Sequence, residues 1–140
     1  MKSNESSEDY LETILILSEK LPVVRSVDIA NEMGYRKSSV SIAMKHLRER
    51  KMITVMDAGY IYLTEEGKKV AETIYERHRF LSAWLCDLGV DSEIAAADAC
   101  RIEHVISGES FAALKKYLKS KGYDPEKGSD KKDADKKRKK

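Results

Sequence analysis

The fold of this chain is decided by residues 26–63, which have the sequence SVDIANEMGYRKSSVSIAMKHLRERKMITVMDAGYIYL. Ser26 is a residue type that caps helices, and Gly34 is one that ends them, so a short helix is expected over residues 26–33. A second helix is expected over residues 37–50, because an apolar stripe recurs there at helical spacing. The stripe consists of Val40, Met44 and Leu47. Two short helices joined at a glycine suggest a helix-turn-helix.

The next segment predicts a β-hairpin. Two β-rich runs, residues 53–56 and 60–63, flank the loop Asp57-Ala58-Gly59. Such runs around a glycine-containing loop are typical of two antiparallel strands. A hairpin that directly follows a recognition-type helix is the wing of a winged helix-turn-helix.

The rest of the chain is expected to be helical. A first helix is predicted over residues 8–20 with Ser7 as its cap, and a long helix of about 23 residues is predicted to follow Thr64 and run to Asp87. Further helices are expected at 91–106 and 109–121, and their apolar faces are too large for a small lobe to bury alone. We therefore predict a mostly α fold: a winged helix-turn-helix (residues 1–70), joined by the long helix to an all-α dimerisation domain (71–123), and a disordered Lys-rich tail (124–140).

Composition excludes several classes of protein. The chain has 140 residues, of which 36% are charged and 41% hydrophobic, and its net charge is +2. No apolar run approaches the ~18 residues of a transmembrane helix. No signal peptide is apparent, and two cysteines cannot form a disulfide framework. These features predict a soluble, cytoplasmic protein.

The charge is distributed unevenly along the chain. Residues 25–51 contain seven basic and three acidic side chains, whereas residues 85–109 contain one basic and six acidic. The first segment suits phosphates and the second suits cations. The tail is also basic, with eight basic and five acidic residues. It is either a solvated tail or a nonspecific phosphate-binding arm.

Three groups of residues are candidate metal ligands. Asp9 and Glu12 share one face of the first helix, and Cys100, Glu103 and His104 share one face of a later helix. His78 lies midway along the long helix. Carboxylate, imidazole and thiolate together suit a divalent transition metal rather than Ca²⁺ or Mg²⁺. Each group also has an ordinary structural interpretation, as solvated helix acids or a helix histidine. Cys86 lacks ligand neighbours and is interpreted as a core residue.

Several motifs, in the same order along the chain, resemble the metal-dependent repressors of the diphtheria toxin repressor family. They are Glu8-Asp9-Tyr10-Leu11-Glu12, Arg25-Ser26-Val27-Asp28-Ile29-Ala30, Ser38-Ser39-Val40-Ser41, Leu63-Thr64-Glu65-Glu66-Gly67, Arg77-His78-Arg79 and Ala99-Cys100-Arg101-Ile102-Glu103-His104-Val105. The length resembles that of the manganese transport regulator branch. The resemblance implies a homodimer with a metal between the two lobes of each subunit.

By position, the resemblance also implies the metal ligands. Asp9, Glu12, His78, Glu103 and His104 match ligands of the manganese branch. Cys100 departs from that branch, which usually has Glu there. The iron branch has Cys at this place but Met at the place of Asp9. The effector is therefore expected to be Mn(II), with Fe(II) next, while Zn(II) or Co(II) can bind in vitro.

The expected partner is a double-stranded, palindromic DNA operator. The candidate DNA contacts are Arg25, Arg36, Lys37, Ser38, Ser39 and Ser41, with Lys45 and Arg48 assigned to phosphates. The family implies repression of metal-uptake genes. Three alternatives stay open: an Fe(II)-responsive repressor, a winged-helix regulator that ignores metal and a small metal-dependent enzyme. The enzyme is disfavoured, because the sequence has no phosphate loop and no nucleophile–base pair. Neither a membrane nor a small-molecule substrate is expected.

Overall fold

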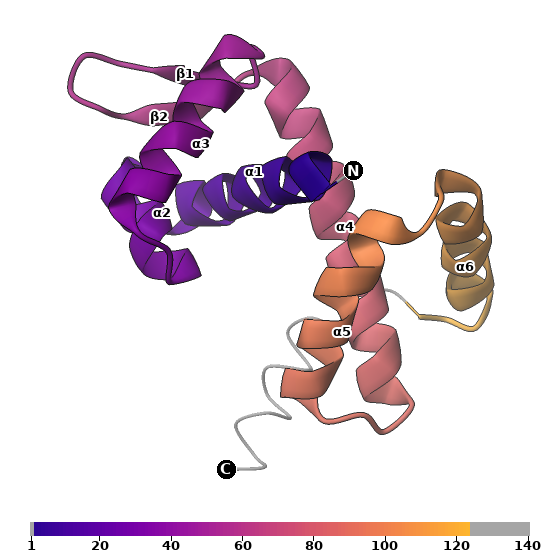
Figure 1. Ribbon diagram of the computed structural model, residues 1–140. Helices are drawn as coiled ribbons and strands as arrows, with labels where there is room; N and C mark the ends of the chain where they lie inside the picture. Colours follow the sequence, from indigo (N-terminus) through magenta and orange to yellow (C-terminus); the bar gives the residue numbers. More distant parts are fainter. Residues whose placement is uncertain (1, 124–140) are drawn as a thin grey trace. The chain divides into compact units, whose positions relative to one another are not determined.

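The computed structural model describes residues 2–123, and the predicted tail at 124–140 lies outside the described residues. Contacts divide the chain into two units, with the boundary between Tyr75 and Glu76. The described part is mostly helical with one two-stranded antiparallel sheet, which confirms the predicted fold class. Its elements (Figure 1) are α1 (Lys2–Lys20), α2 (Ser26–Met33), α3 (Lys37–Glu49), β1 (Ile53–Val55), β2 (Ile61–Leu63), α4 (Glu65–Asp87), α5 (Ser92–Val105) and α6 (Gly108–Ser120).

The first unit is a winged helix-turn-helix. Helices α1, α2 and α3 contact one another, and the β1–β2 hairpin contacts α3 and α1. In the hairpin, Ile53 lies opposite Leu63 and Val55 opposite Ile61. The predicted apolar stripe of α3 is buried, as are α1 and α2 residues that face it. This shared core includes Ile14, Ile29, Val40, Met44, Leu47 and Ile61.

The turn between α2 and α3 follows the prediction at its glycine. Gly34 has φ 71°, in the left-handed region, and its N–H bonds to the carbonyl oxygen of Ala30. The predicted N-cap of α2 is wrong by one residue. Arg25 occupies that position, and its backbone N–H donates to the Asp28 carboxylate at 2.9 Å. The acid in the first turn therefore supplies the cap from inside the helix, and Ser26 is helical.

The predicted start of α1 is also wrong. The helix begins at Lys2, so Ser7 lies within it. Residues 2–7 contain neither Pro nor Gly, and nothing in them stops the helix. The Ser7 hydroxyl instead accepts a hydrogen bond from Nη1 of Arg50 at 3.0 Å. Its side chain joins α1 to the residue that follows α3.

Helix α4 begins as predicted, because the Thr64 hydroxyl accepts a hydrogen bond from the N–H of Gly67 at 3.1 Å. Gly67 is buried in the first turns of the helix. A Cβ at this position would overlap the carbonyl oxygen of Met52. Glycine is therefore required here by a close approach of two backbone segments.

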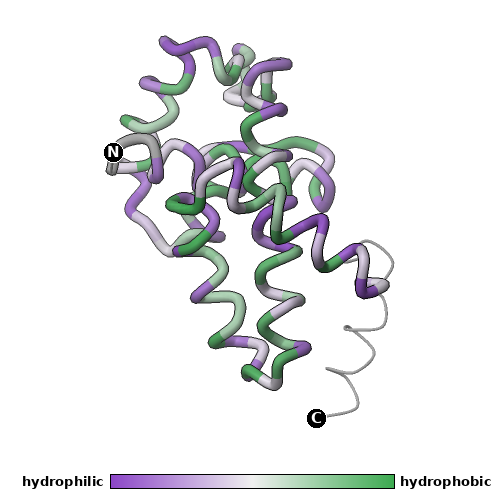
Figure 2. The backbone as a smooth tube through the Cα atoms, turned by 90° about the vertical axis from the view of Figure 1, so that its right-hand side faces the viewer, coloured by the Kyte–Doolittle hydropathy of each residue, from purple (hydrophilic) through white to green (hydrophobic). Residues whose placement is uncertain are grey.

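The second unit contains the later part of α4 together with α5 and α6. Phe80 of α4 packs edge-to-face on Phe111 of α6, with ring centroids 5.9 Å apart. Leu118 completes the buried cluster, and Trp84 packs against it. Along the helices, the tube in Figure 2 alternates between hydrophobic and hydrophilic segments, as amphipathic helices require. No helix of the described residues is long and apolar enough to cross a membrane.

Candidate metal centre and nucleic-acid interface

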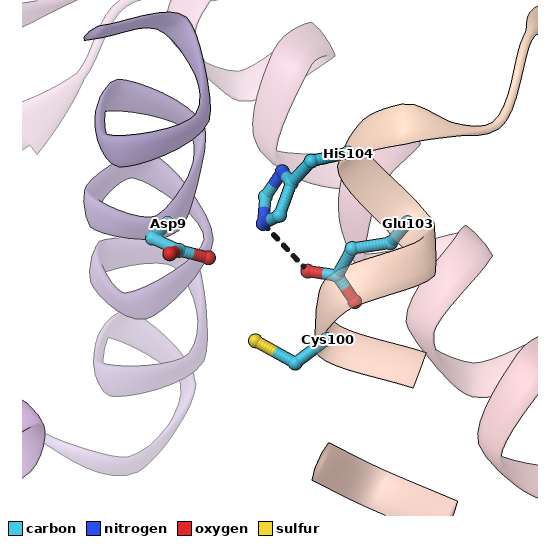
Figure 3. Close-up of side chains that lie close together, drawn as sticks. All are labelled: Asp9, Cys100, Glu103 and His104. Carbon is cyan, nitrogen blue, oxygen red and sulfur yellow. Dashed lines mark ion pairs between the residues drawn. The ribbon is translucent and has the colours of Figure 1, made fainter. Parts of the chain in front are cut away.

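One face of α5 brings together three predicted ligands. Cys100, Glu103 and His104 are spaced i, i+3 and i+4, so one helical turn places them side by side. Each offers a ligand atom within 4.8 Å of the others. Figure 3 shows the thiol, carboxylate and imidazole extending from the same side of α5. The predicted grouping on this helix is thus present in the structure.

Glu103 is the centre of this group. Its side chain is fully buried, with 0% exposure. One carboxylate oxygen lies 2.8 Å from Nδ1 of His78 on α4, and the other lies 3.4 Å from Nε2 of His104. A buried carboxylate stays charged only when cations or hydrogen-bond donors face it. Two imidazoles face this one, so His78 is connected to the α5 residues through Glu103.

Arg77 holds the end of α5 that bears these ligands. Its Nη1 donates to the carbonyl oxygens of Glu103 and Ile106, each at 3.0 Å. Its guanidinium also lies 5.7 Å from the ring centroid of Phe111. A cation at the carbonyl end of a helix is favourable electrostatically. No local sequence pattern indicates this role of Arg77, because its acceptors lie 26 and 29 residues away in the chain.

Asp9 and Glu12 belong to α1 in the first unit. Their spacing places them on one face of the helix, as predicted. Glu12 is 8% exposed, although it is a carboxylate. Tyr10, next to Asp9, is also buried, and its ring packs edge-on against Tyr35 at 6.0 Å. Burial, with a smaller contribution from Tyr35, raises the pKa of Tyr10 above its ordinary value.

The chemistry of these donors fits a divalent transition metal. Hard carboxylates, borderline imidazoles and one soft thiolate are the ligands that Mn²⁺, Fe²⁺, Co²⁺ and Zn²⁺ accept in proteins. Calcium sites consist of oxygen ligands alone, and dedicated protein cages for Mg²⁺ are uncommon. Within the second unit, the ligand atoms of Cys100, Glu103 and His104 are close enough together to hold such an ion, and His78 contacts the same Glu103 carboxylate from α4.

The predicted DNA-contacting residues all face solvent. Val40, Met44 and Leu47 bury the opposite side of α3. The exposed set is Arg25, Arg36, Lys37, Ser38, Ser39, Ser41, Lys45 and Arg48. The only acid of α3 is Glu49, its last residue. Apart from Ile42, the exposed face is thus polar and basic, which suits a surface that approaches phosphates.

Arg25 contacts the wing, and no local sequence pattern predicts this contact. Its guanidinium lies 5.0 Å from the centroid of the Tyr60 ring, and its Nη2 donates to the Tyr60 hydroxyl at 3.3 Å. Tyr60 directly precedes β2. The contact therefore connects the start of α2 to the wing, across 35 residues of sequence.

The first unit is a winged helix-turn-helix with a basic recognition helix, and the second is a helical unit with clustered metal-ligand side chains. Together they define a class of protein, the metal-dependent DNA-binding regulators. Comparison with known families agrees. The N-terminal DNA-binding domain of iron-dependent repressors matches residues 3–57, and their metal-binding and dimerisation domain matches residues 64–131. The chain belongs to this family, the diphtheria toxin repressor family. It is therefore a metal-dependent transcriptional regulator and not an enzyme.

Relatives are found on the manganese branch, as the sequence predicted. The transcriptional regulator MntR of Escherichia coli O6:H1 is 33% identical over 118 residues, which cover 84% of this chain and 76% of the relative. The MntR of Bacillus subtilis is 33% identical over 106 residues, covering 76% of this chain and 75% of the relative.

Solved structures share the fold. The manganese regulator SloR has a TM-score of 0.73 at 27% identity, over 81% of this chain and 53% of that chain. The IdeR of T. acidophilum has a TM-score of 0.71 at 25% identity, over 84% of this chain and 54% of that one. This chain thus spans about half the length of these two solved relatives.

Proposed function

We propose that the protein is a Mn(II)-activated repressor of metal-uptake genes, which binds a palindromic operator as a homodimer in the cytoplasm. The observation that carries the proposal is the buried Glu103 carboxylate, which lies beside His78 and His104 in a unit whose family counterpart binds metal. A relative of the same fold, at 26% identity, is described as a manganese-dependent repressor in complex with manganese. The choice of Mn(II) follows this branch.

The proposed ligands come from both units. They are Asp9, Glu12, His78, Cys100, Glu103 and His104. Residues 1–70 would bind DNA, and residues 71–123 would bind metal and dimerise. The bound ion supplies positive charge that allows these acidic side chains to approach one another.

The protein's own residues then couple metal binding to DNA binding. Asp9 and Glu12 are carried by α1, which packs against α2 and α3. If these acids bind the same ion as the α5 ligands, the recognition helix is fixed relative to the dimerising unit. In a dimer, two recognition helices must match half-sites about 34 Å apart. A coupling free energy of ~1–3 kcal/mol would change DNA affinity about 5- to 150-fold.

An Fe(II)-responsive repressor is the second candidate, because of the thiol of Cys100. A thiolate ligand favours Fe²⁺, Co²⁺ and Zn²⁺, which already exceed Mn²⁺ in intrinsic affinity. Selectivity for Mn²⁺ would then depend on coordination number and geometry. The variant Cys100→Glu restores the residue that is usual in the manganese branch. The metal response of this variant distinguishes a Mn(II)-activated repressor from an Fe(II)-responsive one.

The test is DNA binding by the reduced, anaerobic protein with Mn²⁺, with Fe²⁺ and with a chelator. The duplex is selected from a random library, in parallel with Mn²⁺ and with chelator, and its affinity is measured by fluorescence anisotropy at fixed salt. We expect tight binding with micromolar Mn²⁺ and its loss with chelator. A response to Fe²⁺ alone, converted to a Mn²⁺ response by Cys100→Glu, would favour the iron sensor. Equal binding under all conditions would refute the metal switch.

The ligand assignment has a matched control on the same helix. Glu103→Gln removes the charge of the buried carboxylate with almost no change in volume. Asp98→Asn makes the same chemical change at an exposed position of α5. We expect the first variant to lose the Mn²⁺ response and the second to keep it. If both variants keep the same Mn²⁺ response, Glu103 is not a ligand.

A further inference from the structure

Helix α3 has one large apolar side chain on its exposed face. Ile42 is 58% exposed, whereas Val40, Met44 and Leu47 of the same helix are at most 4% exposed. At 3.6 residues per turn, Ile42 lies about 160° around the helix axis from Val40 and from Met44. It therefore faces away from the core and cannot contribute to it.

The neighbours of Ile42 on this face are short or basic. Its neighbours one turn away, at i−4, i−3, i+3 and i+4, are Ser38, Ser39, Lys45 and His46, and Ser41 precedes it; all five are exposed. A serine side chain is shorter than isoleucine. Ile42 is therefore the large apolar side chain on a part of the helix whose other exposed side chains are short or basic.

Helix stability does not explain isoleucine at this position. β-Branched residues have lower helix propensity than Ala, Leu or Lys, because their χ1 freedom is restricted by the preceding turn. Ile42 therefore exposes apolar area where many residue types would favour the helix more. A functional contact would account for the choice.

We propose that Ile42 is a specificity-determining residue that reads the 5-methyl group of a thymine in the major groove. The inference rests on the proposed DNA-binding function and deepens it. Among the groups at base edges in the major groove, the thymine methyl is the apolar one, and aliphatic side chains recognise it by contact. Lys37 and Lys45, on either side along α3, suit the flanking phosphates.

The experiment replaces thymine by deoxyuridine, which removes the methyl group alone. The duplex is the one selected with Mn²⁺-loaded wild-type protein, and each thymine is replaced in turn. Burial of one methyl-sized group corresponds to an affinity change of about 4-fold. We expect such a loss at one thymine of each half-site, its absence in Ile42→Ala and its retention in Ile42→Val.

Met56→Ala is the matched control, because Met56 is also apolar, is 56% exposed and belongs to the same unit. This variant should keep the deoxyuridine effect. Circular dichroism should show that Ile42→Ala is folded, since the residue lies outside the core. A wild-type protein that is indifferent to every deoxyuridine, or an effect that persists in Ile42→Ala, would overturn the inference while DNA binding stands. Failure to enrich any duplex would overturn the proposed function and this inference with it.

Discussion

Replacing Arg77 should destabilise the second unit and weaken metal binding together. Its Nη1 donates two hydrogen bonds of 3.0 Å to carbonyl oxygens at the end of α5. A hydrogen bond from a charged group contributes ~1.5–3 kcal/mol, and the two share one nitrogen, so they do not add fully. We expect Arg77→Ala to lower the free energy of unfolding by about 2–4 kcal/mol. Since the last turn of α5 bears Glu103 and His104, Mn²⁺ affinity should also fall, by about 10- to 100-fold.

Urea unfolding followed by tryptophan fluorescence measures the first effect. The chain has one tryptophan, Trp84, and it packs in the core of the second unit. Arg101→Ala is the control, because Arg101 is an exposed arginine of α5. The control should change the free energy of unfolding by less than about 0.5 kcal/mol. If Arg77→Ala and Arg101→Ala have equal stability and equal Mn²⁺ affinity, Arg77 does not hold the ligand-bearing turn.

Three further predictions concern packing and charge. Gly67→Ala should lower the free energy of unfolding by an amount at the upper end of the ~1–3 kcal/mol typical of overpacking. In Gly108→Ala the new methyl group meets nothing within 4 Å, so this variant should raise the free energy of unfolding by about 0.4–1 kcal/mol. The melting temperatures of the two variants should therefore shift in opposite directions. Phe111→Ala should cost ~3–5 kcal/mol in urea unfolding, and a cost below about 1 kcal/mol would contradict the assigned core. Lys45→Ala should reduce the slope of log affinity against log salt concentration by about 1 per subunit for every duplex tested. Lys69→Ala, at another exposed lysine, is the control. If both variants have the same, unchanged slope, Lys45 does not contact a phosphate.

The fold was predictable wherever the deciding chemistry is local. Gly34 ends α2, Thr64 caps α4, and the buried stripe of α3 follows from spacing alone. The start of α1 was not predictable, because a serine that can cap a helix can also lie inside one. The hydroxyl of Ser7 bonds to Arg50, which is 43 residues away, and this competing partner cannot be read from the neighbouring sequence.

The candidate site, like the fold, was predictable only where residues close in sequence determine it. The spacing of Cys100, Glu103 and His104 predicted their common face, since one turn of helix determines it. The contact of His78 with Glu103 depends on how α4 packs against α5, and the sequence suggested it only through the family resemblance. Arg77 and the Arg25–Tyr60 contact had no local pattern at all. Gly67 would be judged a weak helix residue from propensity, and only the approach of Met52 explains it.

Metal binding and DNA binding are proposed to be coupled in this chain. Coupling between two ligands is reciprocal, so one factor must describe both directions. The most direct test is the Mn²⁺ affinity of the protein measured with and without the selected duplex, beside the duplex affinity with and without Mn²⁺. We predict that both ratios are equal and lie between about 5 and 150. A Mn²⁺ affinity that is the same with and without DNA would contradict it.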